Sequence, residues 1–437
     1  MTAVTADDDL RGAAISPLTG WLAVRMFLAF AFAYFFSALL RAVTATLAPT
    51  FSDELHLGAG DLGLLAGAYF LGFSVTQLPL GSALDRLGPK RVLLALLAMA
   101  LLGCTAFAAA QNFTQLLLAR GLIGLGVSAC LMAPLTCYRQ RLRPAAQLRA
   151  NSWMLMTGSL GMVSSTLPVQ WLLPHLGWRG LFAGVAVMLL LAMVVILVVA
   201  PPDRADPHQP SGQNTAFSGQ GDATGAGYRE VFGHRTFVAM APLGFFCYGG
   251  LLALQSLWIG PWLTQVAQRS AAEAAQGLFA VNLCMLLAFL GWGLVMPRLV
   301  RTGWTAERVI AWGWPLGVLC MAMILALGPA AGAWAWALWC VCTSVVSLSQ
   351  PAVGQAFPTA LAGRALSAFN LLIFAGVFGL QWGLGLLIDA LRLAGWSSLA
   401  AYRASFGMLL LFGLASFLWL RWVGPAPRAS AQSLTAR

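Results

Sequence analysis

Long apolar segments dominate the pattern of hydrophobic and polar positions along the chain. A helix needs about 20 mostly apolar residues to cross a bilayer. Strands of alternating polarity, which would indicate a membrane barrel, do not stand out in the sequence. The pattern predicts an all-α membrane protein with twelve transmembrane helices, near residues 22–47, 62–84, 92–110, 116–136, 150–173, 179–200, 237–264, 275–297, 309–328, 333–355, 366–388 and 402–422.

One polar stretch interrupts this pattern. Residues 201–236 are rich in Pro, Gly, Ser, Asp and Gln, which is typical of a linker. The stretch divides the chain into an N-terminal six-helix bundle, residues 1–200, and a C-terminal six-helix bundle, residues 237–437. Two halves of equal helix number indicate an internal duplication, the architecture of many secondary transporters. We therefore expect two pseudo-symmetric bundles joined by a cytoplasmic linker.

The basic residues predict the orientation in the membrane. Of the 25 Lys and Arg residues, three lie inside predicted helices and four in predicted outer loops, and the others lie on the predicted inner side. Positive charge collects on the cytoplasmic side of membrane proteins. This distribution predicts a multi-pass protein of the cell (inner) membrane with both termini in the cytoplasm. The four outer residues are Arg179, Arg269, Arg392 and Arg403.

Composition narrows the class of protein. Hydrophobic residues make up 59% of the chain and charged residues 9%, whereas about 25% of an ordinary soluble domain is charged. So few charges cannot cover a soluble surface of this size, so the lipid bilayer is the expected surrounding. A nucleic-acid-binding protein and a water-soluble enzyme are both excluded by this composition.

A charged motif follows the second predicted helix. It reads Gly81-Ser-Ala-Leu-Asp85-Arg86-Leu-Gly88-Pro89-Lys90-Arg91. This motif resembles the loop signature of the major facilitator superfamily, G-x-x-x-D-R-x-G-R-[RK]. Pro89 replaces the first basic residue after the glycine. The resemblance implies the fold of that superfamily and a loop that latches the two bundles in one access state, through Gly81, Asp85, Arg86, Gly88 and Lys90.

Elementary chemistry gives three of these positions a role. Gly81 would permit close helix contact. Asp85 stands at a helix end, where it can pair with an arginine or meet the N-terminus of a neighbouring helix. Gly88 allows a reverse turn.

A second motif lies on the fourth predicted helix, Arg120-Gly-Leu-Ile-Gly124-Leu-Gly126. It resembles the R-x-x-x-G-x-G motif of the same superfamily. The resemblance implies that Gly124 and Gly126 belong to the conformational machinery and that Arg120 faces a central cavity. The fifth predicted helix lacks the glycine–proline motif of drug–proton antiporters, which weighs against multidrug export.

The first predicted helix carries a candidate substrate-binding face. Arg41 lies in the outer half of the membrane, where a charge is costly and therefore indicates a function. Ser37 and Tyr34 precede it at spacings of four and three, so the three side chains share one face. A guanidinium suits a carboxylate or a phosphate. We expect Arg41 and Arg120 to converge on one anionic group, although Arg120 could instead bind backbone carbonyls.

In the second half, two sets of polar and aromatic residues stand at helical spacing. The seventh predicted helix carries Tyr248, Gln255 and Trp258, and the eleventh carries Asn370 and Gln381. Each set is expected to form one face that contributes neutral hydrogen bonds and an apolar wall to the substrate site. The alternative is hydrogen bonding between helices, which explains many membrane Asn and Gln residues.

Titratable and metal-binding groups are scarce in the predicted helices. No Asp, Glu or His stands near the middle of a predicted helix. A co-transported proton therefore remains an open partner: coupling could be peripheral, could depend on the ionisation of the substrate, or could be absent. No cofactor or metal motif is found. The eight cysteines lie in or beside apolar runs, where they act as small hydrophobic residues.

These features predict a secondary transporter. Its expected substrate is a small organic anion or zwitterion, such as a carboxylate-type metabolite, moved by rocker-switch alternating access, with symport and a monomeric state as further expectations. The alternative is a superfamily exporter of drugs or siderophore-like compounds. An intramembrane enzyme is not expected, because the sequence has no H-E-x-x-H, no G-x-S-x-G and no buried carboxylate pair.

Overall fold

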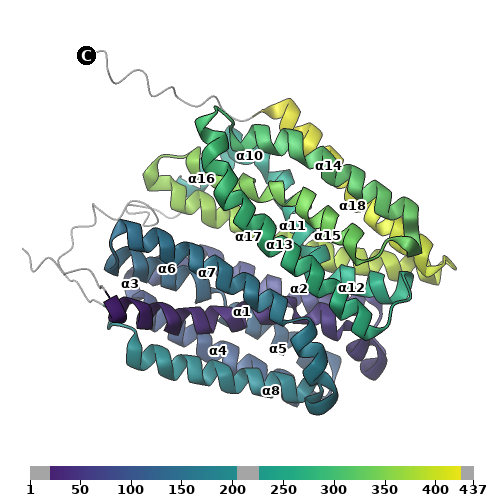
Figure 1. The fold of residues 1–437 in the computed structure, drawn as a ribbon, viewed down its shortest axis with the longest axis horizontal. Helices are drawn as coiled ribbons and strands as arrows, with labels where there is room; N and C mark the ends of the chain where they lie inside the picture. The colour runs from purple at the N-terminus through teal and green to yellow at the C-terminus, as the bar shows by residue number, and fades with distance from the viewer. Residues whose placement is uncertain (1–19, 204–225, 425–437) are drawn as a thin grey trace, which may run out of the picture.

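The first half of the chain folds into a helical bundle that the computed structural model shows in residues 20–203; its description resumes at residues 226–424. Apolar helices satisfy their own backbone hydrogen bonds, which is what lipid requires. Figure 1 shows this half as the lower bundle. Its helices are α1 Gly20–Leu55, α2 Ala59–Val75, α3 Gln77–Leu87, α4 Pro89–Ala109, α5 Phe113–Gly126, α6 Ala129–Arg141, α7 Pro144–Ser164 and α8 Leu167–Val199.

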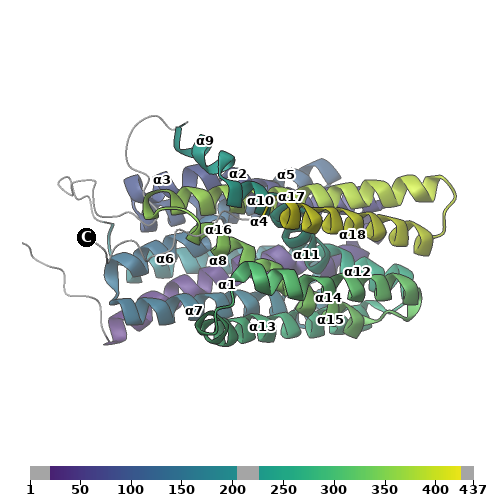
Figure 2. The same ribbon diagram turned by 90° about the horizontal axis from the view of Figure 1, so that it is seen from above.

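The second half forms the upper bundle of Figure 1, and Figure 2 shows the same two bundles from above. Its α-helices are α9 Ala226–Gly233, α10 Arg235–Pro242, α11 Gly249–Ala253, α12 Ile259–Pro261, α13 Ala271–Arg301, α14 Ala306–Leu327, α15 Ala333–Thr343, α16 Ser349–Gln355, α17 Thr359–Leu393 and α18 Ser398–Val423. Its other helical turns are η1 Leu243–Tyr248, η2 Leu254–Trp258, η3 Trp262–Val266, η4 Gly328–Ala330 and η5 Ser344–Leu348.

Twelve membrane crossings can be assigned in the described residues. Ten helical stretches are long and apolar enough to span a membrane, and α2 with α3 forms an eleventh that bends by 46°. Within α8, Gly177 takes a left-handed φ of 62° that reverses the chain, so α8 holds the end of one crossing and the whole of the next. The part before Gly177 continues α7 and completes the twelfth crossing. The predicted all-α fold with twelve spans is confirmed.

Most of the predicted linker, 204–225, lies outside the described residues. Its last part is the short helix α9, whose Val231 is fully buried. Tyr228 and Phe232 pack ring to ring, and Phe232 packs edge-on against Phe237 of α10. The helical structure of the second half therefore begins inside the stretch that its composition predicted to be a linker.

The seventh crossing, Arg235–Val266, is not a regular α-helix. Three of its segments, η1, η2 and η3, are π-helical, with backbone bonds from residue i to i+5. Pro242 directly precedes η1 and Pro261 directly precedes η3, and each proline removes a backbone donor. The wider turns rotate the side chains relative to a regular helix, which changes the faces predicted for Tyr248 and Gln255.

The two ends of the molecule differ in charge. The basic end carries Lys90, which donates to carbonyls at the C-terminal end of α8, and Arg141, which donates to the carbonyl oxygen of Pro202. The acidic end carries Glu54 and Asp389. Glu54 is ion-paired with Arg179 at 2.5 Å. The charge pattern of the sequence predicts that the basic end faces the cytoplasm.

The bundles approach each other closely towards the acidic end. A Cβ atom on Gly260 would lie 2.6 Å from the carbonyl oxygen of Ala45, and one on Gly63 would lie 2.9 Å from the carbonyl carbon of Gln381. Glycine allows this approach because it has no side chain to separate the backbones. Helices α1 and α2 are therefore held against the seventh and eleventh crossings in this half of the molecule.

Candidate functional site

Arg41 lies on the face of α1 that meets the second bundle. Its side chain is half-buried, and its guanidinium carbon stands 5.6 Å from the centre of the Phe73 ring. The phenols of Tyr34, Tyr69 and Tyr248 lie close enough to interact electrostatically with the guanidinium. Its buried Nε atom has no hydrogen-bond partner among the described residues. This arrangement leaves a cation in the membrane with unused capacity to bind an acceptor.

Tyr34 and Ser37, predicted to share this face, are placed differently from each other. Tyr34 is 6% exposed and fits against Gly158 of α7, where a Cβ atom would lie 2.8 Å from the phenol oxygen. Ser37 is 1% exposed, and its carbonyl oxygen accepts a hydrogen bond from the Tyr69 hydroxyl at 3.1 Å. Tyr34 therefore shares the surroundings of Arg41, whereas Ser37 is buried and its carbonyl oxygen is bonded to α2.

An aromatic cluster from both bundles lies beside Arg41. The rings of Phe73 on α2 and Phe374 on α17 have centres 4.6 Å apart, and Phe70 lies 6.2 Å from Phe374. The sequence pattern does not mark Tyr69, Phe70 or Phe73, because aromatic residues on an apolar helix look the same whether they face lipid or a partner. The one feature of the sequence that sets them apart is the local aromatic run Tyr69-Phe70-Leu-Gly-Phe73.

Arg120 is bonded to α1 rather than exposed. It is 1% exposed, and its Nη2 atom donates to the Leu40 carbonyl at 2.8 Å and to Thr44 Oγ1 at 2.5 Å. Its guanidinium carbon also lies 5.1 Å from the centre of the Tyr69 ring. Tyr69 thus interacts with both arginines. In this conformation Arg120 fixes the part of α1 that carries Arg41, and direct contact of Arg120 with a substrate stays a prediction.

Each predicted amide of the second bundle binds a polar side chain on a neighbouring helix. Gln255 donates to Asn282 of α13 at 2.9 Å, Gln381 donates to Ser256 at 2.9 Å, and Asn370 accepts from Gln350. These pairs match the alternative of hydrogen bonding between helices. Their contribution to a substrate site stays a prediction.

Tyr248 and Trp258 lie on the same crossing but in different surroundings. Trp258 is fully buried and packs against Tyr402, with ring centres 6.2 Å apart. Tyr248 is half-buried and lies near Arg41. Of the residues predicted in the second bundle, Tyr248 is the one that the structure brings to the Arg41 cluster.

The charged loop motif ties two helices of the first bundle together at the basic end. Gly88 takes a left-handed φ of 89° between α3 and α4, and Pro89 is the first residue of α4. The backbone N–H groups of Lys90 and Arg91 donate to the Asp203 carboxylate at 2.9 and 2.7 Å. Proline is suited to the first helical position, where its missing N–H has no partner to lose. The departure from the family pattern at Pro89 is therefore compatible with a capped helix start.

The side chain of Lys90 binds the C-terminal end of a helix, whereas Asp203 binds an N-terminal end. Its Nζ atom donates to the carbonyl oxygens of Leu197 and Ala200 at 2.9 and 2.6 Å, at the C-terminal end of α8, where a cation is favoured. Asp85 is exposed, and Arg139 of α6 lies close enough to interact with it electrostatically. Gly81 was expected to permit close helix contact, but the structure places no described atom within 4 Å of a Cβ built there.

Gly124 and Gly126 allow α5 to pack closely on its neighbours. A Cβ atom on Gly124 would lie 2.7 Å from the carbonyl carbon of Tyr69 on α2. One on Gly126 would lie 2.6 Å from the Cα atom of Ala100 on α4. Both glycines therefore serve backbone packing, and they hold α2, which carries Tyr69 and Phe73, in place.

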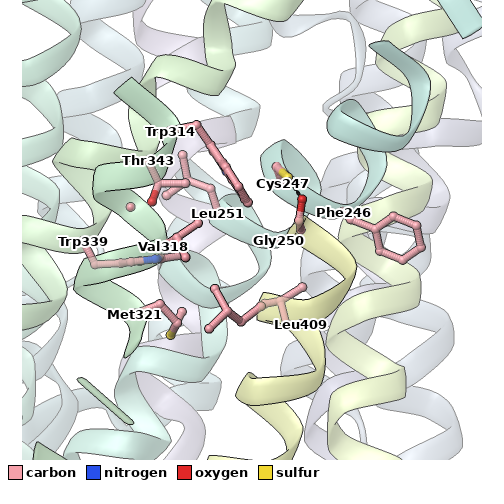
Figure 3. Close-up of a pocket in the computed structure, with 13 residues that line it drawn as sticks. Phe246, Cys247, Gly250, Leu251, Trp314, Val318, Met321, Trp339, Thr343 and Leu409 are labelled. Atoms are coloured by element: carbon pink, nitrogen blue, oxygen red, sulfur yellow. Dashed lines mark hydrogen bonds between the residues drawn. The ribbon is translucent and has the colours of Figure 1, made fainter. Parts of the chain in front are cut away.

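A small apolar cavity lies inside the second bundle (Figure 3). Its volume is about 30 Å³, the share of one water molecule in the liquid. Its lining includes Cys247, Trp314, Met321, Thr343 and Leu409. The cavity is too small for an organic substrate, so it does not compete with the Arg41 cluster. Among the described residues, no group of three or more His, Cys, Asp or Glu side chains could hold a metal ion.

Known proteins resemble this chain in sequence. The sequence profile of the Major Facilitator Superfamily matches residues 30–380. A gallate transporter of Pseudomonas putida is 27% identical over 312 residues, which cover 65% of this chain and 67% of that protein. A probable L-galactonate transporter of Escherichia coli (strain K12) is 30% identical over 151 residues, and a niacin transporter of Acinetobacter baylyi is 27% identical over 148 residues. These last two matches span about a third of each relative, 31% and 33% of its length.

Solved structures show the same fold. A bacterial homolog of the human lysosomal transporter Spinster, in an inward-facing and unoccupied conformation, has a TM-score of 0.71 at 17% identity, with 93% of this chain and 98% of that chain covered. A D-xylose–proton symporter has a TM-score of 0.71 at 13% identity, with 91% and 97% covered. The profile match over most of the chain shows that the protein belongs to the Major Facilitator Superfamily.

Proposed function

We propose that this transporter moves a small organic carboxylate across the cytoplasmic membrane by alternating access, with Arg41 as the residue that binds the carboxylate. The observation that carries the proposal is the half-buried Arg41 guanidinium, whose Nε atom has no described hydrogen-bond partner and which faces residues of both bundles. A cation in the membrane without a counter-charge is costly. A carboxylate substrate would supply that counter-charge and would use the fork of the guanidinium.

The surroundings of Arg41 favour an aromatic carboxylate. Phe73 and Phe374 come from different bundles and meet beside the guanidinium, with Tyr248 also near it. Offset or edge-on stacking with these rings would hold a flat ring while Arg41 binds its carboxylate. The names of two relatives, a gallate transporter and a niacin transporter, denote ring carboxylates, and the L-galactonate relative shares the carboxylate alone.

The proposal also includes the orientation in the membrane, the direction of transport, the oligomeric state and the coupled ion. The charge pattern supports an inner-membrane protein with the basic end, and hence both termini, in the cytoplasm. The missing glycine–proline motif of the fifth crossing supports import rather than drug export. We propose a monomer as the transporting unit, and a proton as a candidate co-substrate whose site is not one of the residues around Arg41.

A thermal-shift measurement on the purified protein tests the substrate class. Gallate and nicotinate should raise Tm by on the order of 2 °C or more at saturating concentration, because a ligand that binds only the folded state stabilises it. Methyl gallate and nicotinamide keep the ring but carry no carboxylate, so they should leave Tm unchanged. An equal shift with the uncharged compounds would show that Arg41 does not bind a carboxylate here.

A further inference from the structure

Asp389 stands near the end of α17, in the second bundle, and binds the first bundle through its carboxylate. Its Oδ1 atom accepts a hydrogen bond from the backbone N–H of Ala59 at 3.0 Å. Its Oδ2 atom accepts one from the backbone N–H of Gly60 at 2.6 Å. Ala59 and Gly60 are the first residues of α2. One side chain of the second bundle thus caps a helix of the first bundle, at the acidic end of the molecule.

The cap satisfies donors that α2 cannot satisfy itself. The first N–H groups of a helix have no partner within the helix, and the helix dipole favours a negative charge at this position. Within the same turn, Asp61 accepts a hydrogen bond from the N–H of Gly58 at 3.2 Å. The two carboxylates therefore divide the donors between them: Asp61 serves its own helix, and Asp389 serves it from across the bundle interface.

Glycines make room for the Asp389 carboxylate. A Cβ atom on Gly58 would lie 2.8 Å from Oδ2 of Asp389, and one on Gly60 would lie 3.1 Å from the same oxygen. A Cβ atom at Gly58 would force the carboxylate to shift, and one at Gly60 would crowd it. The sequence Gly58-Ala-Gly60 and Asp389 are therefore complementary in shape as well as in charge.

The position of Asp389 mirrors that of Asp85 in the loop motif. The span formed by α2 and α3 begins at the Asp389 contact and ends at Asp85, and α17 runs beside it. Asp85 belongs to the motif that, by resemblance, latches one end of the bundles in one access state. Asp389 stands at the opposite end of the same pair of spans, and its carboxylate already holds the two bundles together.

We propose that Asp389 is the latch that keeps the acidic end of the transporter closed, and that this end opens only when its carboxylate leaves the N-terminus of α2. The proposal rests on alternating access from the proposed function. It does not depend on the substrate or on Arg41, because the latch joins backbone and carboxylate atoms away from that cluster.

Pulsed EPR distances test the latch in the full chain without substrate. Nitroxides are attached through p-acetylphenylalanine at Gln111 and Leu393, two exposed positions in different bundles at the acidic end, so the native cysteines stay in place. Asp389→Asn keeps the shape and removes the charge. It should raise the ratio of long to short distances about tenfold, a coupling of ordinary size for two states of a protein.

Two further variants separate the latch from general damage to α2. Gly60→Ala should raise the same ratio although Asp389 is intact, because the new Cβ crowds the carboxylate and weakens its hydrogen bond to the N–H of residue 60. Asp61→Asn weakens the cap within the helix and should leave the distances unchanged, as should Gly291→Ala, which has no described neighbour within 4 Å. The proposal is overturned if Asp389→Asn and Gly60→Ala keep the parent distances, or if Asp61→Asn opens this end equally.

Discussion

Replacement of Arg41 by alanine should lower the uptake of an aromatic carboxylate by about 100-fold or more while the folded protein stays in the membrane. Loss of one partner from a buried, hydrogen-bonded charge pair costs several kcal/mol, which corresponds to this range. The fold should survive, because Arg41 is only half-buried and its Nε atom has no described hydrogen-bond partner, in contrast to the buried Arg120 with its bonds to Leu40 and Thr44.

Uptake of labelled nicotinate into right-side-out vesicles measures this effect, with the amount of protein in the membrane determined in parallel. Arg41→Lys keeps the charge but loses the planar fork, so an intermediate loss of about tenfold is expected. Arg25→Ala is the matched control, since Arg25 lies on the same helix and is exposed near its start. Parent-like uptake by Arg41→Ala would remove this residue from the substrate site.

Gly124→Leu should prevent the first bundle from packing, and Gly124→Ala should destabilise it by about 1–3 kcal/mol, the usual cost of overfilling a packed interior. The reason is the backbone of Tyr69, whose carbonyl carbon would lie 2.7 Å from the new Cβ atom. A backbone atom of a buried helix cannot turn aside as a flexible side chain can. The displacement would also move Tyr69 and Phe73 away from Arg41.

Size-exclusion chromatography and thermal unfolding in detergent report this destabilisation. Gly121→Ala provides the comparison within α5, because a Cβ atom there would lie 3.8 Å from the Ala68 carbonyl oxygen, an ordinary contact distance. Gly121→Ala should therefore keep a Tm close to that of the parent. Equal Tm values for the two alanine variants would contradict the assigned role of Gly124.

The twelve crossings could be predicted from the sequence because the bilayer imposes a simple rule on length and polarity. The segment boundaries were harder to predict. The structure places a chain reversal at Gly177, where a left-handed φ costs glycine nothing. It also places the short helix α9 in a stretch whose composition indicated only a linker. Local geometry of this kind depends on packing against neighbours that the sequence pattern does not name.

Helical spacing predicts which side chains share a face only where the helix is regular. Tyr34 and Arg41 lie on one α-helix, so their spacing of seven brings them to one face, where they interact electrostatically, while their part in a substrate site stays a prediction. The same spacing does not bring Tyr248 and Gln255 to one face, because Tyr248 is the last residue of η1 and Gln255 lies in η2, both of which are π-helical. Tyr248 reaches the Arg41 cluster, whereas Gln255 binds Asn282.

Contacts across the bundle interface were beyond the sequence. Phe73 meets Phe374, and Asp389 meets Gly60, over separations of about 300 residues. Neither pair has a local pattern that distinguishes it from residues that face lipid or solvent. Such pairs become visible only when the tertiary arrangement of the two bundles is known.

The contacts of the Asp203 carboxylate show that the first half of the transporter extends, as a folded unit, to residue 203. Asp203 stands after the last residue of α8, in the segment whose composition resembled a linker, yet it completes the start of α4. If the protein is produced as two separate polypeptides, a break before Asp203 would leave the first two donors of α4 bare at the membrane surface. A break after it would keep the first half self-sufficient.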